Sequence, residues 1–457
     1  MTEPLTVTAA APLIRSGELT PSELLEQCLR RIDVYEPAVK AWVHLDRERA
    51  RQEAEELTKG IRAGHYCGEL HGIPVGIKDI IDVFDMPTGC GSKLWANSYA
   101  RQDAECVKRL RQAGALILGK TVTTPYAFTD PPVTRNPWNL DRTPGGSSSG
   151  SAAAVACGMC LAALGTQTGG SLTRPASYCG VCCLKPTHGR VSVNGVLPLA
   201  PSLDHVGVMA NCVRDLAVVF EAIAGANGRV VHDTFGKRFP EQEEPDYGHF
   251  WILDRTDDFA DVAIESEMLR AFADFLRALT ADKPVANRTA AVTPNRLPPG
   301  FSAVVGHHLT MMATEAATVH RDRFRRRPDE YPPRIAELIE RGLAASASAL
   351  AESQQFRERM VADLRNRFRF LLMPATLGAA PTPESTGNPV LNAPWSFVGL
   401  PVVSVPFGTT PDGLPLATQI VSKAGWEDEA LRVAEWCEQV VALPRRLPPV
   451  PDPARGS

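Results

Sequence analysis

The sequence predicts an α/β fold in which helices cover a β-sheet. Segments with helical periodicity alternate with short β-branched runs through the first half of the chain, and this alternation is typical of α/β proteins. The 457 residues are enough for one large core or for two domains. Because no internal repeat or low-complexity linker interrupts them, we expect a single domain over residues 1–457.

Composition and charge narrow the class of protein. Apolar residues make up 44% of the chain and charged residues 22%, as in ordinary globular proteins. A net charge of −4 provides no field that would attract nucleic acid or an anionic membrane. The first residues lack the basic start and long apolar run of an export signal, and no stretch reaches eighteen unbroken apolar residues. The eleven cysteines often lie inside apolar runs. We therefore expect a cytoplasmic protein without nucleic-acid or membrane partners.

Residues 1–65 are predicted to form helices. Residues 20–23 read Thr-Pro-Ser-Glu, which is a capping box with proline at the first helical position, and apolar residues follow at helical spacing. A second, charged helix is expected around Asp46–Arg62. Both helices precede the first strand that we expect.

Residues 66–230 are expected to form the catalytic core. The β-branched run Gly72–Ile81 predicts a central strand that ends at Lys78, and a capped helix from Asp103 to about Ala113 leads into the next strand. Thr121–Thr143 has no periodicity and carries four prolines, so we expect an irregular loop. The remaining elements are expected in this order: strand Ala115–Leu118, helix Ser151–Cys157, strand Met159–Leu164, helix Ser171–Ser177, strand Val181–Leu184 and helix Val213–Ala224.

The second half of the chain is predicted to be more helical. After a strand at Phe250–Leu253 and a helix at Ile264–Leu279, residues 300–369 become helical and arginine-rich, and the arginines from Arg321 to Arg327 are expected to form a solvated helix face. The proline-rich tail, residues 444–457, is expected to be loosely held. Residues 366–443 are expected to contain strands at Phe370–Met373, Pro401–Pro406 and Leu416–Val421 and an amphipathic helix at Glu427–Val440.

Two glycine–serine turns between Gly145 and Pro175 indicate a functional site. Residues 146–150 match the G-x-S-x-G pattern with Ser148 as nucleophile, but that motif must follow a strand, and Arg-Thr-Pro precedes it here. A phosphate-binding loop would need lysine where Ser151 stands. The C-x-x-C pairs at residues 157–160 and 179–182 lie in apolar segments, which disfavours a zinc site.

Lys78 is the candidate general base, and a structural lysine in a satisfied ion pair is the alternative. A serine hydroxyl becomes a nucleophile when a base takes its proton, and a lysine can do so near pH 7 only if burial keeps it neutral. The neighbouring valine and isoleucines provide that apolar setting. Asp79 would favour the charged amine, but side chains of adjacent strand residues point to opposite faces, so we expect Asp79 to point away.

Several motifs taken together resemble the amidase signature family. They are GIPVGIKD at residues 72–79, TPGGSSSGS at 143–151, GTQTGGS at 165–171 and CGVCCLKPT at 179–187. Later, GLP at 399–401 and DGLP at 412–415 with Gln419 also look like the family pattern, so the resemblance spans nearly the whole chain. It implies a large mixed β-sheet covered on both faces by α-helices.

The resemblance also implies the roles of the site residues. Ser171 corresponds to the acyl-forming nucleophile, Lys78 to the general base and Ser147 to the serine that relays the proton, with a cis peptide bond between Gly146 and Ser147. The implied oxyanion hole consists of the backbone N–H groups of Thr168, Gly169 and Gly170. These N–H groups precede a helix start and can converge on the oxygen of a tetrahedral intermediate.

Two positions depart from the usual family pattern. Most members carry aspartate where Gln167 stands and arginine where Thr173 stands, whereas here the arginine is Arg174. With TDPPVTRNP at residues 129–137, this arrangement is similar to that of the malonamidase-like members, in which the corresponding arginine holds a substrate carboxylate. A structural arginine that ties loops together stays open as the alternative.

Other substrate contacts are expected from position in the family fold. The helical segment 294–365, in particular Pro294–Ala345, is expected to contribute to the substrate entrance. The tentative substrate-binding residues besides Arg174 are Gly146, Asn392 and Trp395, the last two from a stretch, Asn392–Trp395, that is expected to line the entrance.

The resemblance implies an amidohydrolase that cleaves a C–N bond of a small substrate through an acyl-enzyme on Ser171, without a metal or cofactor. Esters, aryl amides and carbamates pass through a similar oxyanion and are open as substrates. One alternative is the A subunit of a tRNA-dependent amidotransferase. The residues at positions 167 and 173, Gln167 and Thr173, disfavour this alternative. Another is a catalytically silent binding protein, which the three filled catalytic positions disfavour. A homodimer stays open.

Overall fold

The computed structural model describes residues 3–224, 250–252, 259, 262–281, 292–294, 296–365, 367–444 and 446–451. The expectations for residues 225–230, Leu253 and 452–457 lie outside these ranges. Eleven strands of the described chain form one sheet in the order β1-β3-β2-β4-β6-β5-β10-β11-β9-β7-β8. The strands are β1 (Trp42–Leu45), β2 (Pro74–Lys78), β3 (Leu116–Thr121), β4 (Ala162–Gln167), β5 (Cys182–Lys185), β6 (His205–Ala210), β7 (Phe250–Ile252), β8 (Val292–Pro294), β9 (Phe370–Pro374), β10 (Val402–Thr409) and β11 (Pro415–Ser422).

The sheet is mixed. β2 is parallel to both β3 and β4, whereas the strands from β4 through β6, β5, β10 and β11 to β9 alternate in direction. β7 is parallel to β9 and to β8. Because β2 and β4 are parallel neighbours, both end at the same edge of the sheet. The predicted α/β class with a large mixed sheet is confirmed.

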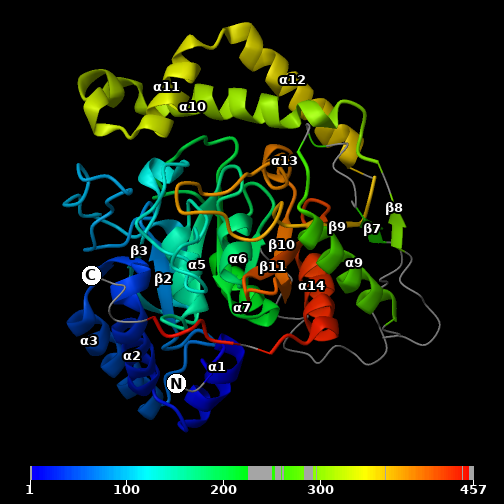
Figure 1. The fold of residues 1–457 in the computed structure, drawn as a ribbon. Helices are drawn as coiled ribbons and strands as arrows, with labels where there is room; N and C mark the ends of the chain where they lie inside the picture. The colour runs from blue at the N-terminus through cyan, green and yellow to red at the C-terminus, as the bar shows by residue number, and fades with distance from the viewer. Residues whose placement is uncertain are drawn as a thin grey trace.

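Helices cover both faces of this sheet. The helices are α1 (Val7–Ser16), α2 (Pro21–Val39), α3 (Arg47–Arg62), α4 (Glu105–Gln112), α5 (Ser149–Ala156), α6 (Thr173–Cys179), α7 (Val213–Ala224), α9 (Ser266–Ala281), α10 (Val304–Arg326), α11 (Pro333–Ala344), α12 (Ala347–Leu364), α13 (Ala393–Phe397) and α14 (Glu427–Val441). α5 and α6 contact each other and the middle strands, and α7 and α14 form a second such pair. α10, α11 and α12 form a further layer across the top of the molecule in Figure 1.

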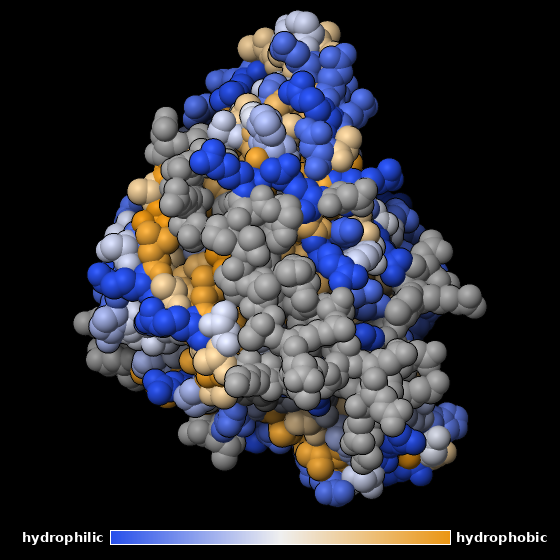
Figure 2. All heavy atoms as spheres, turned by 90° about the vertical axis from the view of Figure 1, so that its right-hand side faces the viewer, coloured by the Kyte–Doolittle hydropathy of each residue, from blue (hydrophilic) through white to orange (hydrophobic). Residues whose placement is uncertain are grey.

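The helical layer carries the predicted solvated arginines. Arg321, Arg325, Arg326 and Arg327 are exposed, but the guanidinium of Arg323 lies 3.8 Å from the ring centroid of Trp95, so it is a packing residue. Figure 2 shows the face at the right of Figure 1, where hydrophilic residues gather on the upper part of the molecule. Within the described residues, no helix is both long and apolar enough to cross a membrane.

Local sequence signals predicted α2 and α3 among the N-terminal elements. The capping box of α2 is present, because the Thr20 side chain accepts from Glu23 N and the Glu23 carboxylate accepts from Thr20 N. α1 was not predicted, although Thr6 caps its start and Gly17, at φ +80°, ends it. Its internal proline and the lack of charge in its first turn weakened the helical pattern.

Two predicted details of the core are wrong, and three strands of the sheet were missed. Asp103 does not cap α4, which starts after Ala104 without a side-chain cap; the Asp103 carboxylate instead accepts hydrogen bonds from Phe84 N and Arg111 Nε. β4 lies three residues later than expected, so that it ends at Gln167. β6, which pairs with both β4 and β5, was not expected, and neither were β1 and β8.

The C-terminal tail is held at one point. The Tyr35 hydroxyl donates a hydrogen bond to the carbonyl oxygen of Pro448 at 2.9 Å, and Pro448 is buried. The expectation of a loose tail from residue 444 onward is therefore wrong for this residue.

Candidate active site

The candidate site lies where β2 and β4 end, at one edge of the sheet. Lys78 is the last residue of β2, and the turn of residues 168–171 connects the end of β4 to α6. The other glycine–serine turn leads into α5, and Ser148 N donates to the carbonyl oxygen of Ser171 at 3.3 Å. The structure thus brings the two serine turns together beside Lys78.

Lys78 is buried and touches two hydroxyl groups. Its Nζ lies 2.6 Å from Ser147 Oγ and 2.7 Å from Thr166 Oγ1. Burial lowers the pKa of Lys78 well below its ordinary value, and the nearby negative charge of Asp204 only partly opposes this. A neutral amine has two N–H groups and a lone pair, so it can donate to Thr166 and accept from Ser147.

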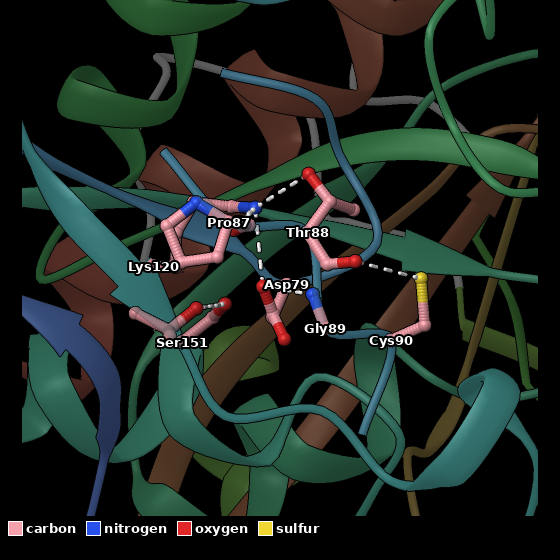
Figure 3. Close-up of polar contacts among 8 residues, drawn as sticks. Asp79, Pro87, Thr88, Gly89, Cys90, Lys120 and Ser151 are labelled. Carbon is pink, nitrogen blue, oxygen red and sulfur yellow. Dashed lines mark hydrogen bonds and ion pairs between the residues drawn. The ribbon is translucent and has the colours of Figure 1, made fainter. Parts of the chain in front are cut away.

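Asp79 points away from Lys78, as predicted. Its Oδ1 accepts hydrogen bonds from Lys120 Nζ and from Gly89 N, both at 3.1 Å. Figure 3 shows this carboxylate beside Lys120 and the segment Pro87–Cys90. Because the carboxylate of Asp79 is bound to Lys120, it does not contact the Lys78 amine.

Ser147 and Ser171 differ in accessibility. Ser147 is fully buried and follows a cis peptide bond from Gly146, as the family resemblance implied. Ser171 is 8% exposed, and among the described residues its hydroxyl has no hydrogen-bond partner. Of the two candidate serines, Ser171 is therefore the one that a substrate can reach.

The turn before Ser171 presents free backbone donors. Within the described part of the chain, no acceptor binds the N–H groups of Gly169, Gly170 and Ser171. The carbonyl oxygens of Thr168, Gly169 and Gly170 all accept hydrogen bonds, from His308 Nε2, Ser396 Oγ and Arg174 N respectively. Such a row of donors at a helix start suits a developing negative charge.

Gln167 and Thr173, the two departures from the family pattern, contact each other. Thr173 Oγ1 donates to Gln167 Oε1 at 3.2 Å, and the same oxygen accepts from the N–H groups of Leu172 and Thr173. The amide of Gln167 therefore satisfies the first donors of α6 without a charge. Its Nε2 donates to Ser396 Oγ at 3.1 Å.

Arg174 ties two loops together and also keeps unused donors. Its Nη2 donates to the carbonyl oxygen of Gly146 at 2.8 Å and to Thr386 Oγ1 at 3.3 Å. Arg174 is 2% exposed, its Nε and Nη1 have no partner among the described residues, and burial lowers its pKa to about 10. Arg174 thus ties the two loops together, as the structural alternative expects, and it also keeps two buried nitrogens without a partner among the described residues.

The other tentative substrate residues lie in different settings. Asn392 Nδ2 donates to Ala375 O and Gln419 Oε1, while its buried Oδ1 has no partner within the described chain. Trp395 is fully buried, and its described ring contacts are with Phe301 and Phe368. The structure therefore places Trp395 in an aromatic cluster.

The residues of the G-x-S-x-G pattern, the phosphate-binding loop and the zinc site that were considered above have structural roles. Ser148 is buried, and its hydroxyl bonds to the backbone of Thr166, so it is unsuited to act as an exposed nucleophile. The hydroxyl of Ser151 donates to Leu164 O. The cysteines of both C-x-x-C pairs are buried free thiols.

Sequence reasoning missed several residues that contact the site, among them Thr166, Ser396 and His308. Thr166 lies inside the GTQTGGS motif, and the parallel pairing of β2 with β4 would have brought it near Lys78. Ser396 and His308 lie more than a hundred residues away from the turn along the chain, and no local pattern marks them.

Comparisons with known proteins identify the family of the chain. The family model described as Amidase matches residues 23–431. A putative amidase AmiD of Mycobacterium tuberculosis (strain ATCC 25618 / H37Rv) is 34% identical over 465 residues, covering 98% of this chain and 96% of that protein. The glutamyl-tRNA(Gln) amidotransferase A component of Roseiflexus castenholzii is also 34% identical, over 486 residues and 98% of both chains.

Solved structures of amidases have a similar fold over nearly the whole chain. A crystal structure of an amidase superposes with a TM-score of 0.82 at 31% identity, covering 95% of this chain and 99% of that one. Peptide amidase from Stenotrophomonas maltophilia gives a TM-score of 0.80 at 26% identity, with coverage of 97% and 98%.

Proposed function

Because this chain belongs to the amidase family, we propose that it hydrolyses the C–N amide bond of a small substrate through an acyl-enzyme on Ser171. The observation that carries the proposal is the contact between Lys78 Nζ and Ser147 Oγ at 2.6 Å, in a buried setting without a contacting carboxylate. Such a lysine is neutral and can accept a proton.

The proposed first step forms the acyl-enzyme. Ser171 Oγ attacks the substrate carbonyl carbon while its proton passes to Ser147, and the proton of Ser147 passes to Lys78 Nζ. The carbonyl oxygen becomes an oxyanion, which the N–H groups of the turn at residues 168–171 stabilise. When the tetrahedral intermediate collapses, the C–N bond breaks and the proton returns through Ser147 to the leaving amine.

The second step releases the acid. A water molecule attacks the ester carbonyl carbon of the acylated Ser171 and gives its proton to the same relay, and a second tetrahedral intermediate forms. The bond to Ser171 Oγ then breaks and the serine recovers its proton. Esters, aryl amides and carbamates can follow the same route, because each forms an oxyanion at the same place.

Arg174 suits a substrate that carries a carboxylate. Its Nε and Nη1 are buried beside the turn without a partner among the described residues, and a carboxylate bound to one of them would compensate the guanidinium charge. A panel of malonamic acid, neutral anilides and carbamates tests this point. Preference for the neutral compounds would overturn the carboxylate part of the proposal.

A second candidate function is that of the amidotransferase A component. The Roseiflexus castenholzii relative named as such matches 98% of this chain, and its name places it in a transferase. Purification of this chain from its native cells with associated partner proteins would favour this function. Turnover of simple amides by the isolated chain would favour the hydrolase.

Replacement of Ser171 tests the chemistry itself. Ser171→Ala should lose at least about 10⁴-fold in kcat and all labelling by a fluorophosphonate, because the attacking atom is gone. Ser353→Ala serves as the matched control, since Ser353 is a buried serine of α12 whose hydroxyl bonds to His307 and Ala349. Near-normal turnover by Ser171→Ala would refute the mechanism.

A further inference from the structure

The peptide units of residues 168–170 are each held from one side. In a trans peptide unit the C=O and the N–H point in opposite directions. The unit that carries Thr168 C=O also carries Gly169 N–H, and the unit that carries Gly169 C=O also carries Gly170 N–H. A hydrogen bond to either carbonyl therefore decides where the following N–H points.

His308 and Ser396 supply these two hydrogen bonds. His308 Nε2 donates to Thr168 O at 2.9 Å, and Ser396 Oγ donates to Gly169 O at 2.8 Å. The N–H groups of Gly169 and Gly170 on the opposite side have no acceptor among the described residues. Glycine adds no steric restriction of its own, so these peptide planes depend on such external contacts.

We propose that His308 and Ser396 are positioning residues that turn the N–H groups of Gly169 and Gly170 toward the substrate carbonyl oxygen. This inference rests on the proposed function, because it concerns the oxyanion of that reaction. The two residues come from different elements, His308 from α10 in the helical layer and Ser396 from α13.

Gln167 fixes the direction of the Ser396 hydrogen bond. Gln167 Oε1 accepts from two backbone N–H groups, so its other atom must be the amide nitrogen, which can only donate. Ser396 Oγ accepts from that nitrogen at 3.1 Å and has a single proton, which goes to Gly169 O. Glutamine at position 167 therefore supplies an N–H donor to Ser396 that an aspartate carboxylate could not supply.

His308 is suited to its role as a neutral donor. A carbonyl oxygen only accepts, so Nε2 of His308 carries the proton. His308 is 3% exposed, and burial lowers its pKa to about 4, so the ring adds no positive charge near neutral pH. Its ring also packs edge-on against Phe397, at 6.4 Å between centroids.

Variants of His308 and Ser396, each with a control of the same residue type, test the proposal. His308→Leu and Ser396→Ala remove the donors, and His308→Gln keeps an N–H donor. His307→Leu and Ser404→Ala are controls, because His307 bonds to Ser353 on α12 and Ser404 bonds to Ser177. Each variant is assayed for kcat and KM on an amide that the wild type cleaves. The affinity for a boronic acid, which forms a tetrahedral adduct on the serine, is measured alongside.

The expected result separates positioning from structure. His308→Leu and Ser396→Ala should each lower kcat about 10- to 100-fold and weaken boronate binding by a similar factor, with KM within about twofold. His308→Gln should recover most of the loss, and both controls should behave as wild type. Ser396→Ala, which removes a single hydroxyl, keeps the test valid if His308→Leu does not fold.

Two outcomes would contradict the inference in distinguishable ways. If the wild type turns over substrate and His308→Leu and Ser396→Ala match it in kcat and boronate affinity, the positioning role is wrong and the proposed function stands. If the wild type neither hydrolyses the substrate panel nor reacts with a fluorophosphonate, the proposed function is wrong and the positioning role is wrong with it.

Discussion

Two buried lysines lie on adjacent strands of the sheet and point to opposite faces, where their surroundings differ. Lys78 ends β2 and Lys120 lies on β3, where the register pairs Ile77 with Lys120. Lys120 Nζ donates to Asp79 Oδ1 at 3.1 Å, to Pro87 O at 2.8 Å and to Thr88 Oγ1 at 3.1 Å (Figure 3). Among the residues that the structure describes, Lys78 Nζ contacts two hydroxyl groups and no carboxylate.

The difference shows how one residue type serves two purposes in one sheet. Three acceptors, one of them charged, match the three donors of an ammonium group at Lys120. Burial lowers the pKa of both lysines, but at Lys120 the contact with Asp79 opposes the effect. Lys120 therefore holds the segment Pro87–Thr88 through an ion pair with Asp79, whereas Lys78 has the uncharged contacts that the proposed neutral base requires.

The largest expected effect is that of Lys78→Met. Without the base, kcat should fall by at least about 10⁴-fold. The free energy of unfolding should stay the same or rise, because methionine replaces a buried amine that has no carboxylate partner. Steady-state kinetics and urea denaturation measure both quantities. Loss of activity with a large loss of stability would instead make Lys78 a structural residue.

Lys120→Met should give the opposite pattern. Removing the ammonium leaves the buried Asp79 carboxylate without compensation, which costs about 3–5 kcal/mol of unfolding free energy. Where the variant is still folded, kcat per folded molecule should stay close to wild type. Adding Asp79→Asn to Lys120→Met should recover part of the stability, and an unchanged double variant would contradict the ion-pair interpretation.

The pH dependence of kcat/KM sharpens the comparison further. The base must be neutral, so the rate should rise with pH through the pKa of Lys78 and then level off, falling about tenfold per pH unit below that pKa. Because burial lowers this pKa, the rise should be complete well below the ordinary lysine value of 10.5. A midpoint at the ordinary value would show that Lys78 is not held neutral.

The sequence predicted the parts of the site that depend on local pattern. The end of β2 at Lys78 and the opposite orientation of Asp79 follow from strand periodicity, and the two serine turns follow from their glycines. These features depend on residues that are neighbours along the chain, so they can be predicted without knowledge of the fold. Their mutual contact was expected only from the family resemblance.

The parts that failed depend on contacts between distant segments. β6 has an uneven pattern, and its place between β4 and β5 is fixed by pairing on both sides. His308 reaches the turn because α10 packs over it. Lys120 could not be predicted as the partner of Asp79, because the contact depends on the pairing of β3 with β2. Asp103 resembles a cap but is satisfied by Arg111 and Phe84.

The contact between Gln167 and Thr173 has a consequence for substitutions at these two positions. Both side chains are buried and neutral, and they share one hydrogen bond. A charged residue placed at only one of these two positions would lose this hydrogen bond and would bury a charge that the other position does not compensate. The two positions are therefore expected to be coupled, so that replacing both together costs less stability than the sum of the two single replacements.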